Sequence, residues 1–180
     1  MKALKITLKN ININEKFSEE TTMFMADVYV DGVKTAHAKN DGHGGSSWYH
    51  AYEGKEDLLK QAERYALGLS AIKFDTFELD MNLENLIDGL IEDILKLKDQ
   101  AKFDKQLLRD METNICFGVP NSGGYKRIGY GKQHKLADLA KQEKGREAIA
   151  KLVTRIKGEL KEGEEIFNKN LEPVTALKRR

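Results

Sequence analysis

The hydrophobic periodicity of this chain changes along its length, and this change limits the folds that are open to it. Before residue 40, apolar and polar residues alternate in three runs, the period-2 pattern of half-buried strands. Between residues 56 and 111, apolar residues instead recur at helical spacing. The sequence therefore predicts an α+β protein in which a small antiparallel sheet of three strands plus a helix precedes a mainly helical part with one β-hairpin.

The three expected strands follow one another closely in the sequence. The first covers residues 4–13 and slips at Asn10, where the apolar positions change parity. Residues 24–30 form the second strand, and residues 33–39 form the third. The dipeptide Asp31-Gly32 between them favours a tight two-residue hairpin turn, so these two strands are expected to pair directly.

The hairpin turn also predicts which residues lie opposite each other. With two turn residues and no irregularity, Val28 faces Thr35 and Ala26 faces His37. The side chain of His37 is then expected on the same sheet face as Val28.

Helical spacing predicts two long helices in the middle of the chain. The first covers residues 56–69, and the second starts after Asn82, whose side chain can cap it, and runs over residues 83–111 with a kink or break near 99–101. Between the two helices, residues 72–79 are consistent with either an edge strand or an extended connector.

The last third of the sequence combines a hairpin with helices. Residues 115–119 alternate, residues 120–124 form a dense turn cluster, and residues 125–130 return as the second arm. A short helix is expected from residue 136, and an apolar stripe over residues 148–160 predicts another helix.

The chain length suits one compact unit built from two modules. Its 180 residues are enough for one good core, and we expect a module of residues 1–80 packed against a module of residues 81–180. The N-terminal residues show no continuous apolar run, which argues against a secretion signal or a membrane span. The single cysteine, Cys116, excludes an intramolecular disulfide, so a reducing, cytoplasmic location is expected.

Charge is distributed unevenly although the net charge is only +1. Residues 55–100 hold 6 Lys and Arg against 11 Asp and Glu, whereas residues 115–158 hold 10 against 3. A basic region of this size can attract phosphates or an acidic protein surface. Alternatively, the acidic and basic segments neutralise each other within the molecule.

The segment from Asn40 to Tyr52 is the most unusual stretch of the sequence. It concentrates glycines, two histidines, two tyrosines and the only tryptophan, and it is long for a strand-to-helix connection. One interpretation is a partner-binding loop; the other is that the glycines let the chain fold back and bury Trp48 and Tyr49 under the sheet. The candidate partner-binding residues are His43, Trp48, Tyr49, His50 and Tyr52.

The histidines of this region raise the possibility of a metal-dependent enzyme. His37, His43 and His50 are separated by six and seven residues, with two carboxylates nearby. These spacings match no compact metal motif, and hydrogen-bonding roles in the sheet and loop are the alternative. The glycines also fit neither the Walker nor the dinucleotide-binding pattern. We therefore assign no metal ligand and no cofactor.

A second candidate surface lies on the C-terminal hairpin. Tyrosines interleaved with basic residues can stack bases and neutralise phosphates. An ordinary exposed hairpin, with tyrosines covering the core, is the alternative. The candidate anion- or nucleic-acid-binding residues are Tyr125, Lys126, Arg127, Tyr130, Lys132 and Lys135.

Three stretches of the sequence carry a resemblance to known proteins. They are Asn40-Asp-Gly-His-Gly-Gly, Lys132-Gln-His-Lys-Leu-Ala-Asp-Leu and Gly163-Glu-Glu-Ile-Phe-Asn-Lys-Asn-Leu. Together they resemble small accessory proteins of phages and mobile elements. The resemblance implies a non-enzymatic protein that binds a host protein or nucleic acid, and it carries over no catalytic residue.

These features favour a non-catalytic intracellular binding protein with a protein or nucleic-acid partner and no membrane association. No paired carboxylates and no nucleophile motif stand out, and Cys116 reads as a small buried hydrophobe. The alternatives are a nucleic-acid-binding protein that uses the basic region 115–158 and the metal-dependent enzyme described above.

Overall fold

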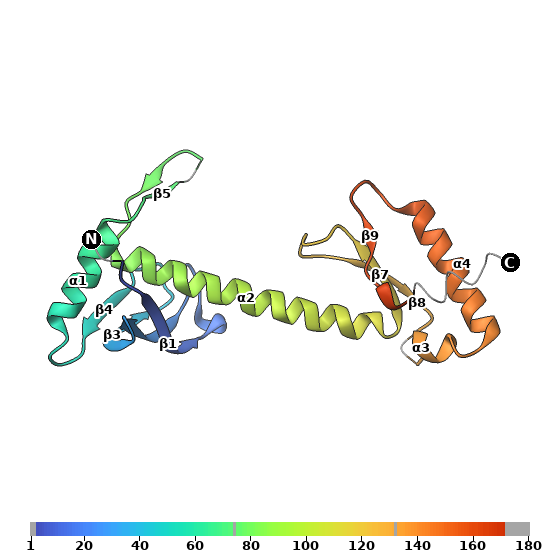
Figure 1. The fold of residues 1–180 in the computed structure, drawn as a ribbon, viewed down its shortest axis with the longest axis horizontal. Helices are drawn as coiled ribbons and strands as arrows, with labels where there is room; N and C mark the ends of the chain where they lie inside the picture. The colour runs from blue at the N-terminus through green and yellow to red at the C-terminus, as the bar shows by residue number, and fades with distance from the viewer. Residues whose placement is uncertain (1–2, 74, 132, 172–180) are drawn as a thin grey trace. The chain divides into compact units, whose positions relative to one another are not determined.

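The structure is a computed structural model that describes residues 3–73, 75–131 and 133–171 (Figure 1). It combines antiparallel sheets with helices, so the predicted α+β class is confirmed. The chain divides into two compact units, Met1–Lys96 and Leu97–Arg180, and the division falls inside the long helix α2 (Leu83–Met111). The modules expected from the sequence, 1–80 and 81–180, stay a prediction.

The N-terminal unit is built on one antiparallel sheet with the strand order β1-β2-β3-β4. Its strands are β1 (Ile6–Ile13), β2 (Phe24–Val30), β3 (Val33–Asn40) and β4 (Trp48–Ala51). The prediction of three strands is therefore wrong by one strand. The fourth strand is only four residues long, and aromatic side chains occupy both of its faces. It therefore shows no alternation of apolar and polar residues from which it could be predicted.

Two local features of this sheet confirm the sequence analysis. The pairing of β1 with β2 shifts register between Lys9 and Asn12, and Asn10 has a φ of 49°, which places the expected slip there. At the hairpin, Asp31 and Gly32 both have positive φ, 47° and 83°. Positive φ at both central residues is what a type I′ turn requires.

The predicted register of the next strand pair is wrong because β3 contains a bulge. Val28 lies opposite Ala36, and Asp27 lies opposite His37, with a shift between Val28 and Tyr29. Thr35 is the extra residue, and its hydroxyl donates a hydrogen bond to the Val33 carbonyl at 2.8 Å. The bulge reverses the parity of β3 beyond this point. His37 therefore lies on the opposite face from Val28.

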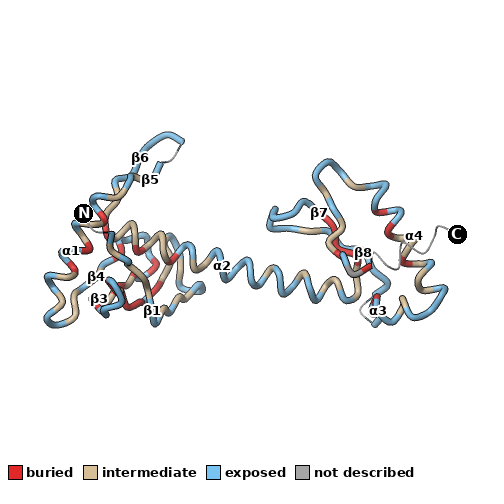
Figure 2. The backbone as a smooth tube through the Cα atoms, in the orientation of Figure 1, coloured by how far each residue is buried: buried red, intermediate tan, exposed pale blue. Residues whose placement is uncertain are grey.

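One face of the sheet forms the core of the N-terminal unit. Helix α1 (Glu56–Leu67) and the first part of α2 pack against this face. The buried residues, red in Figure 2, lie on the sides of the sheet and the helices that pack together. Apolar burial of this kind is the main stabilising contribution to a fold of this size. The buried residues are Phe24, Ala26, Val28, Val30, Ala36, Ala38, Leu59, Ala62, Ala66, Leu83, Ile87 and Ile91.

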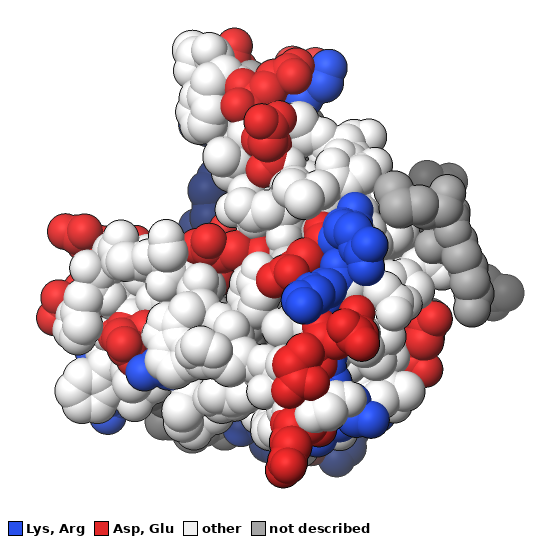
Figure 3. All heavy atoms as spheres, turned by 90° about the vertical axis from the view of Figure 1, so that its left-hand side faces the viewer, with Lys and Arg blue, Asp and Glu red and all other residues white. Residues whose placement is uncertain are grey.

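The chain between α1 and α2 forms a small hairpin of β5 (Ile72–Lys73) and β6 (Glu78–Leu79). Acidic side chains gather on this hairpin at the top of the face seen in Figure 3, where Asp75 and Asp80 are exposed and Glu78 pairs with Lys73 at 3.3 Å. Part of the acidic charge of residues 55–100 is thus presented to solvent. A short 3-10 helix, η1 (Glu15–Phe17), connects β1 to β2.

Helix α2 confirms one prediction and contradicts another. The Asn82 side chain accepts a hydrogen bond from the backbone N–H of Asn85 at 2.7 Å, as expected of a cap. The sequence predicts a kink or a break near residues 99–101; a break is contradicted, because α2 is a single helix from Leu83 to Met111, and a kink stays a prediction. No glycine or proline lies near those residues, and side chains one turn apart, such as Gln100 and Asp104, bond to each other there.

The C-terminal unit holds a second, separate core. The predicted hairpin is confirmed as β7 (Asn114–Gly118) and β8 (Lys126–Gly129), and a short strand β9 (Glu165–Ile166) adds to the other edge of β7. Helices α3 (Leu136–Leu139) and α4 (Glu143–Glu159) and a 3-10 helix η2 (Lys169–Leu171) complete it. The buried residues are Ile115, Phe117, Leu136, Ile149, Val153, Ile156 and Leu171.

Cys116 lies on β7 and is fully buried. Burial, with a smaller contribution from the charge of Asp110, raises the pKa of its thiol to about 11. The thiol is therefore protonated at neutral pH, which agrees with the expected role of a small buried hydrophobe.

None of the helices in the described ranges is long and apolar enough to cross a membrane.

Candidate functional site

The face of the N-terminal sheet that points away from α1 and α2 carries most of the chemistry of this unit. Cross-strand pairing places aromatic rings, imidazoles and lysines side by side on it, because side chains of successive residues alternate between faces. We call this surface the open face. It consists of Thr7, Lys9, Met25, Asp27, Tyr29, Lys34, His37, Lys39, Trp48, His50 and Tyr52, the last of which directly follows β4.

Trp48 stands on the open face and not under the sheet. Its side chain is 39% exposed, and its ring centroid lies 5.0 Å from that of His50 at an interplanar angle of 63°. The ammonium of Lys39 lies 4.3 Å from the centroid of the Trp48 ring. A cation over the face of an indole ring is held by the ring quadrupole. Trp48 is thus ordered by its neighbours while much of its surface stays in contact with solvent.

Tyr49 points in the opposite direction from Trp48. It is half-buried and packs against the apolar core of the unit. Burial and the neighbouring carboxylate of Glu63 raise the pKa of its hydroxyl to about 12. The interpretation in which the segment buries its aromatics therefore holds for Tyr49 and fails for Trp48.

Asp27 organises one side of the open face. It is only 7% exposed and accepts hydrogen bonds from the Tyr52 hydroxyl, from Asn10 Nδ2 at 2.7 Å and from Lys34 Nζ at 2.9 Å. Burial alone would raise the pKa of this carboxyl, but the three hydrogen bonds outweigh burial and lower it to about 2. Asp27 is therefore a fixed negative charge in the sheet.

The same contacts hold Lys34 and Tyr52 in place. The hydrogen bond to Asp27 raises the pKa of Lys34, and its ammonium lies 4.5 Å from the centroid of the Tyr52 ring. A further cation–aromatic pair forms between Lys9 and Tyr29, with 4.3 Å between the ammonium and the ring centroid. The open face thus carries three lysine–aromatic pairs among its residues.

The loop before β4 is fixed by the side chain of Asn40. Its Oδ1 accepts hydrogen bonds from Thr21 Oγ1 and from the Gly42 N–H, both at 2.8 Å. Its Nδ2 donates to the Gly45 carbonyl at 2.9 Å and to Ser47 Oγ at 3.0 Å. All the hydrogen-bonding capacity of a buried amide is used here. These hydrogen bonds fix the conformation of the glycine-rich loop and so the position at which β4 begins.

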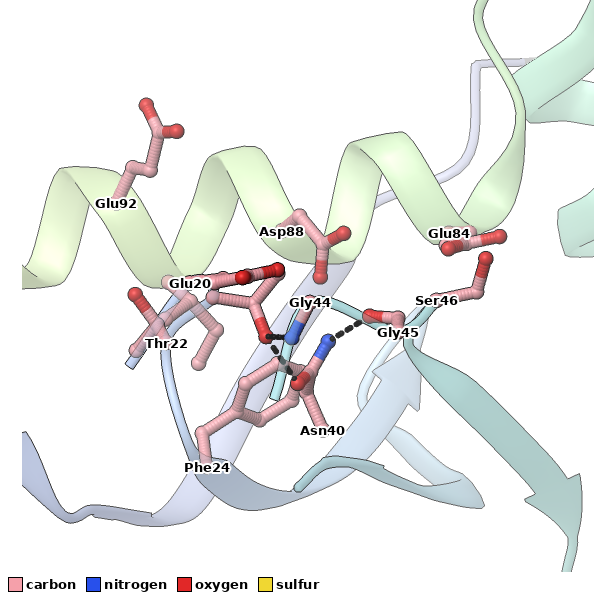
Figure 4. Close-up of a pocket in the computed structure, with 12 residues that line it drawn as sticks. Glu20, Thr22, Phe24, Asn40, Gly44, Gly45, Ser46, Glu84, Asp88 and Glu92 are labelled. Carbon is pink, nitrogen blue, oxygen red and sulfur yellow. Dashed lines mark hydrogen bonds between the residues drawn. The ribbon is translucent and has the colours of Figure 1, made fainter. Parts of the chain in front are cut away.

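Ser47 connects this loop to the start of helix α2. Its N–H donates to Glu84 Oε1 at 3.0 Å, and its hydroxyl donates to Asp88 Oδ1 at 2.6 Å. In Figure 4 the Asp88 carboxylate points from α2 toward the loop. Burial, together with the charges of Glu84 and Glu92, raises the pKa of Asp88, against the hydrogen bond from Ser47 that lowers it.

A pocket of about 430 Å³ lies between the loop and α2. Carboxylates of Glu20, Glu84, Asp88 and Glu92 line it (Figure 4). Within the described ranges, however, no group of three or more His, Cys, Asp or Glu side chains is arranged to hold a metal ion. The Ser47 contacts with Glu84 and Asp88 hold the loop against the helix beside this pocket.

The three histidines of the metal hypothesis lie in two different environments. His37 and His50 are cross-strand partners on the open face. His43 belongs to the loop, where its Nδ1 lies 3.1 Å from Glu19 Oε2 and its side chain is 65% exposed. The structure thus joins His37 and His50 to the aromatic surface and places His43 in an exposed contact with Glu19.

The five residues of the predicted partner-binding loop are divided in the same way. Trp48, His50 and Tyr52 contribute to the open face, Tyr49 contributes to the core, and His43 lies in the loop. The strand alternation of β4 explains this division. From the sequence the whole segment is expected to be a loop, so its two faces are not separated there.

The hairpin residues proposed to bind anions are engaged with carboxylates of their own unit. Lys126 Nζ lies 2.7 Å from Glu164 Oε1, and Lys135 Nζ lies 3.2 Å from Glu112 Oε2. Arg127 forms an ion pair with Asp110. The carboxylate side chains of Glu164 and Asp110 are 8% and 13% exposed. Lys126 and Arg127 are thus neutralised by largely buried carboxylates, whereas both partners of the Lys135–Glu112 pair are exposed.

The tyrosines of this hairpin differ in exposure. Tyr125 donates a hydrogen bond to Asp110 Oδ2 at 2.7 Å and packs edge-on against Phe103, with 5.4 Å between ring centroids. Burial and Asp110 raise the pKa of its hydroxyl to about 12, and the bond from Tyr125 is the largest cause of the lowered pKa of Asp110. Tyr130 is 37% exposed. Lys132 lies outside the described residues.

Most of the open face was missed in the sequence. The residues assigned to strands but not to a site are Thr7, Lys9, Met25, Asp27, Tyr29, Lys34 and Lys39. One signal was present in β2. The outer face of an antiparallel sheet usually carries polar residues, but two of the three outer positions of β2 are Met25 and Tyr29. The places of His37 and Lys39 could not be predicted, because the bulge at Thr35 moves both residues onto this face.

Comparisons with known proteins add no family assignment: a scan of protein-family models, a search of curated proteins and a search of solved structures each found no match.

Proposed function

We propose that this protein is a non-catalytic binding protein that holds a macromolecular partner on the open face of its N-terminal sheet. The observation that carries this proposal is the exposed indole of Trp48 on a regular strand, flanked by Lys39 and His50. The resemblance to accessory proteins of phages and mobile elements extends the proposal to a host macromolecule as the partner.

Preorganisation of the surface supports this proposal. Trp48 lies on a hydrogen-bonded strand whose preceding loop is fixed by Asn40 and Ser47, so little conformational freedom is lost when a partner binds. Exposed tryptophan and tyrosine side chains are the groups that most often dominate binding energy in interfaces. A rigid sheet therefore presents large aromatic contact area at low entropic cost.

The proposal is tested by affinity capture with a matched pair of variants. Tagged wild-type protein, Trp48→Ala and Leu67→Ala are used as baits in an extract of cognate cells. Leu67 is 67% exposed on α1, which packs on the other face of the sheet, so it controls for loss of an exposed apolar side chain. We expect Trp48→Ala to weaken capture by about thirtyfold or more, corresponding to roughly 2 kcal/mol at an interface hot spot.

Circular dichroism and thermal melts of the three baits show whether each is folded. Trp48 is partly exposed, so its replacement is expected to leave the melting temperature close to that of the wild type. Equal capture of the same partner by wild type and folded Trp48→Ala would refute a role for the open face.

A further inference from the structure

The lysine–aromatic pairs of the open face contain the two groups that recognise a nucleotide. An aromatic ring stacks on a base, and an ammonium neutralises a phosphate. On this face Lys39 accompanies Trp48 and Lys9 accompanies Tyr29, each with 4.3 Å between the ammonium and the ring centroid. A flexible lysine can move from the ring to a neighbouring phosphate when a base takes its place over the ring.

The lysines of the open face differ in how firmly they are held. Lys34 bonds to the buried carboxylate of Asp27 at 2.9 Å, so its charge is neutralised where it stands. Lys39 pairs at 3.2 Å with Asp41, whose side chain is 63% exposed. Exposed ion pairs of this kind contribute little and exchange readily with other ligands. Lys39 is therefore a cation that a phosphate can recruit, and so is Lys9, which is exposed on β1 beside the Tyr29 ring.

The spacing of the two rings suits a strand of several nucleotides. Trp48 pairs with Lys39, and Lys39 pairs with Met25, so these three residues lie side by side across the sheet. Tyr29 lies four residues further along β2 than Met25. Standard strand geometry then separates the two rings by about 13 Å along the strands and about 10 Å across them. A single nucleotide cannot reach both rings, so an extended chain of bases is required.

The bases must also be unpaired. In a duplex they are stacked inside the helix, and their π-faces are not accessible to side chains on a flat sheet. A single strand can splay successive bases onto aromatic side chains while its backbone follows the cations. The hairpin of the C-terminal unit offers less, since Lys126 and Arg127 are paired with the largely buried carboxylates of Glu164 and Asp110.

We propose that the open face binds single-stranded nucleic acid, with bases stacked on Trp48 and Tyr29 and phosphates held by Lys9 and Lys39. This inference rests on the proposed function, because it names the partner class of the same surface. Recognition through ring faces and phosphates gives little dependence on base sequence.

The test uses the only tryptophan of the chain as its reporter. The full-length protein is titrated at low salt with oligothymidylate of about 12 nucleotides, a length within the usual range of single-strand sites. We expect quenching of Trp48 fluorescence, no comparable quenching by a duplex of the same length, and binding of a fluorescein-labelled oligomer that Trp48→Ala weakens about ten- to one-hundredfold.

Salt dependence measures the phosphate contacts independently. Two recruited lysines predict a log–log slope near −1.4, and Lys39→Gln should reduce its magnitude by about 0.7. Lys60→Gln, an exposed lysine on α1, is the matched control and should leave the slope unchanged. Loss of binding in Lys126→Gln, with Trp48→Ala unaffected, would overturn the inference and place the site on the hairpin.

Failure of the inference can be told apart from failure of the proposed function. If no oligomer quenches Trp48 or binds at low salt, the open face does not bind single strands and the inference is wrong. The broader proposal then survives only if nuclease-treated extract still yields a partner that depends on Trp48. If capture is also independent of Trp48, both are wrong.

Discussion

At the scale of single residues, Asp27 links the fold of the sheet to the composition of its open face. Its carboxylate lies almost out of contact with water and takes hydrogen bonds from β1, from β3 and from the residue after β4. A buried carboxylate is favourable only when its hydrogen-bonding capacity is filled. Asp27 therefore ties four consecutive chain segments together through one side chain.

The lowered pKa of Asp27 predicts an acid-sensitive contribution to stability. Its pKa falls from 3.8 to about 2 on folding, so the unfolded chain binds the proton more readily. The contribution is fully present above pH 4 and is lost as the pH falls toward 2. We expect the loss between pH 5 and pH 2 to amount to about 2 kcal/mol. Urea unfolding followed by Trp48 fluorescence at pH 5, 3 and 2 measures it.

Asp27→Asn is the control for that measurement. It should be less stable than the wild type at pH 5 by about 1 to 3 kcal/mol, because an amide cannot satisfy the same donors. Its unfolding free energy should then fall less steeply between pH 4 and 2. Parallel pH profiles for the two proteins would show that Asp27 does not supply the acid-sensitive term.

At the scale of elements, the loop between β3 and β4 depends on the backbone of Gly42. This residue has a φ of +87°, and an added Cβ would lie 2.5 Å from the Phe17 carbonyl oxygen. Its own carbonyl accepts a hydrogen bond from the Glu19 N–H at 2.9 Å. The position thus requires glycine for both conformation and space.

Gly42→Ala and Gly45→Ala form a matched pair in the same loop. Gly42→Ala should lower the unfolding free energy of the N-terminal unit by about 1 to 3 kcal/mol through strain and steric overlap. A Cβ at Gly45 would meet no heavy atom within 4 Å, so Gly45→Ala should change stability by less than about 0.5 kcal/mol. Equal effects in urea unfolding would mean that Gly42 is not specially constrained.

The elements that could be predicted from the sequence are those with a local signal. Alternation located β1 to β3, helical spacing located α1 and α2, and a turn cluster located the hairpin of β7 and β8. Strand β4 and the bulge at Thr35 had no such signal, because their positions depend on pairing with a neighbouring strand. The open face was missed for the same reason: it exists only once four strands are aligned.

At the scale of the whole molecule, the described residues form two hydrophobic cores with no residue in common. One gathers around the N-terminal sheet, and the other gathers around β7 and α4. The single helix α2 contributes residues to both units. Stability is therefore expected to be a property of each unit and not one quantity for the chain.

Ile149→Ala tests this expectation. Ile149 is fully buried on α4, so its truncation should destabilise the C-terminal unit by about 2 to 5 kcal/mol. Denaturation followed by circular dichroism should then show an earlier transition, while the Trp48 fluorescence midpoint stays unchanged. A coincident shift of both signals would indicate that the two units unfold as one.

The bulge in β3 has a consequence for how such a sequence can change over time. Point substitutions on the open face alter one side chain each, so its affinity and partner preference can be adjusted step by step. Loss of the bulged residue Thr35 would remove the bulge and still leave Ala36 opposite Val28 and His37 opposite Asp27. Loss of a paired residue such as His37 would instead shift the rest of β3 by one position, placing Lys39 on the core face and Ala38 on the open face. Substitutions on the open face should therefore be tolerated, whereas the loss of a residue of β3 that pairs with β2 should not.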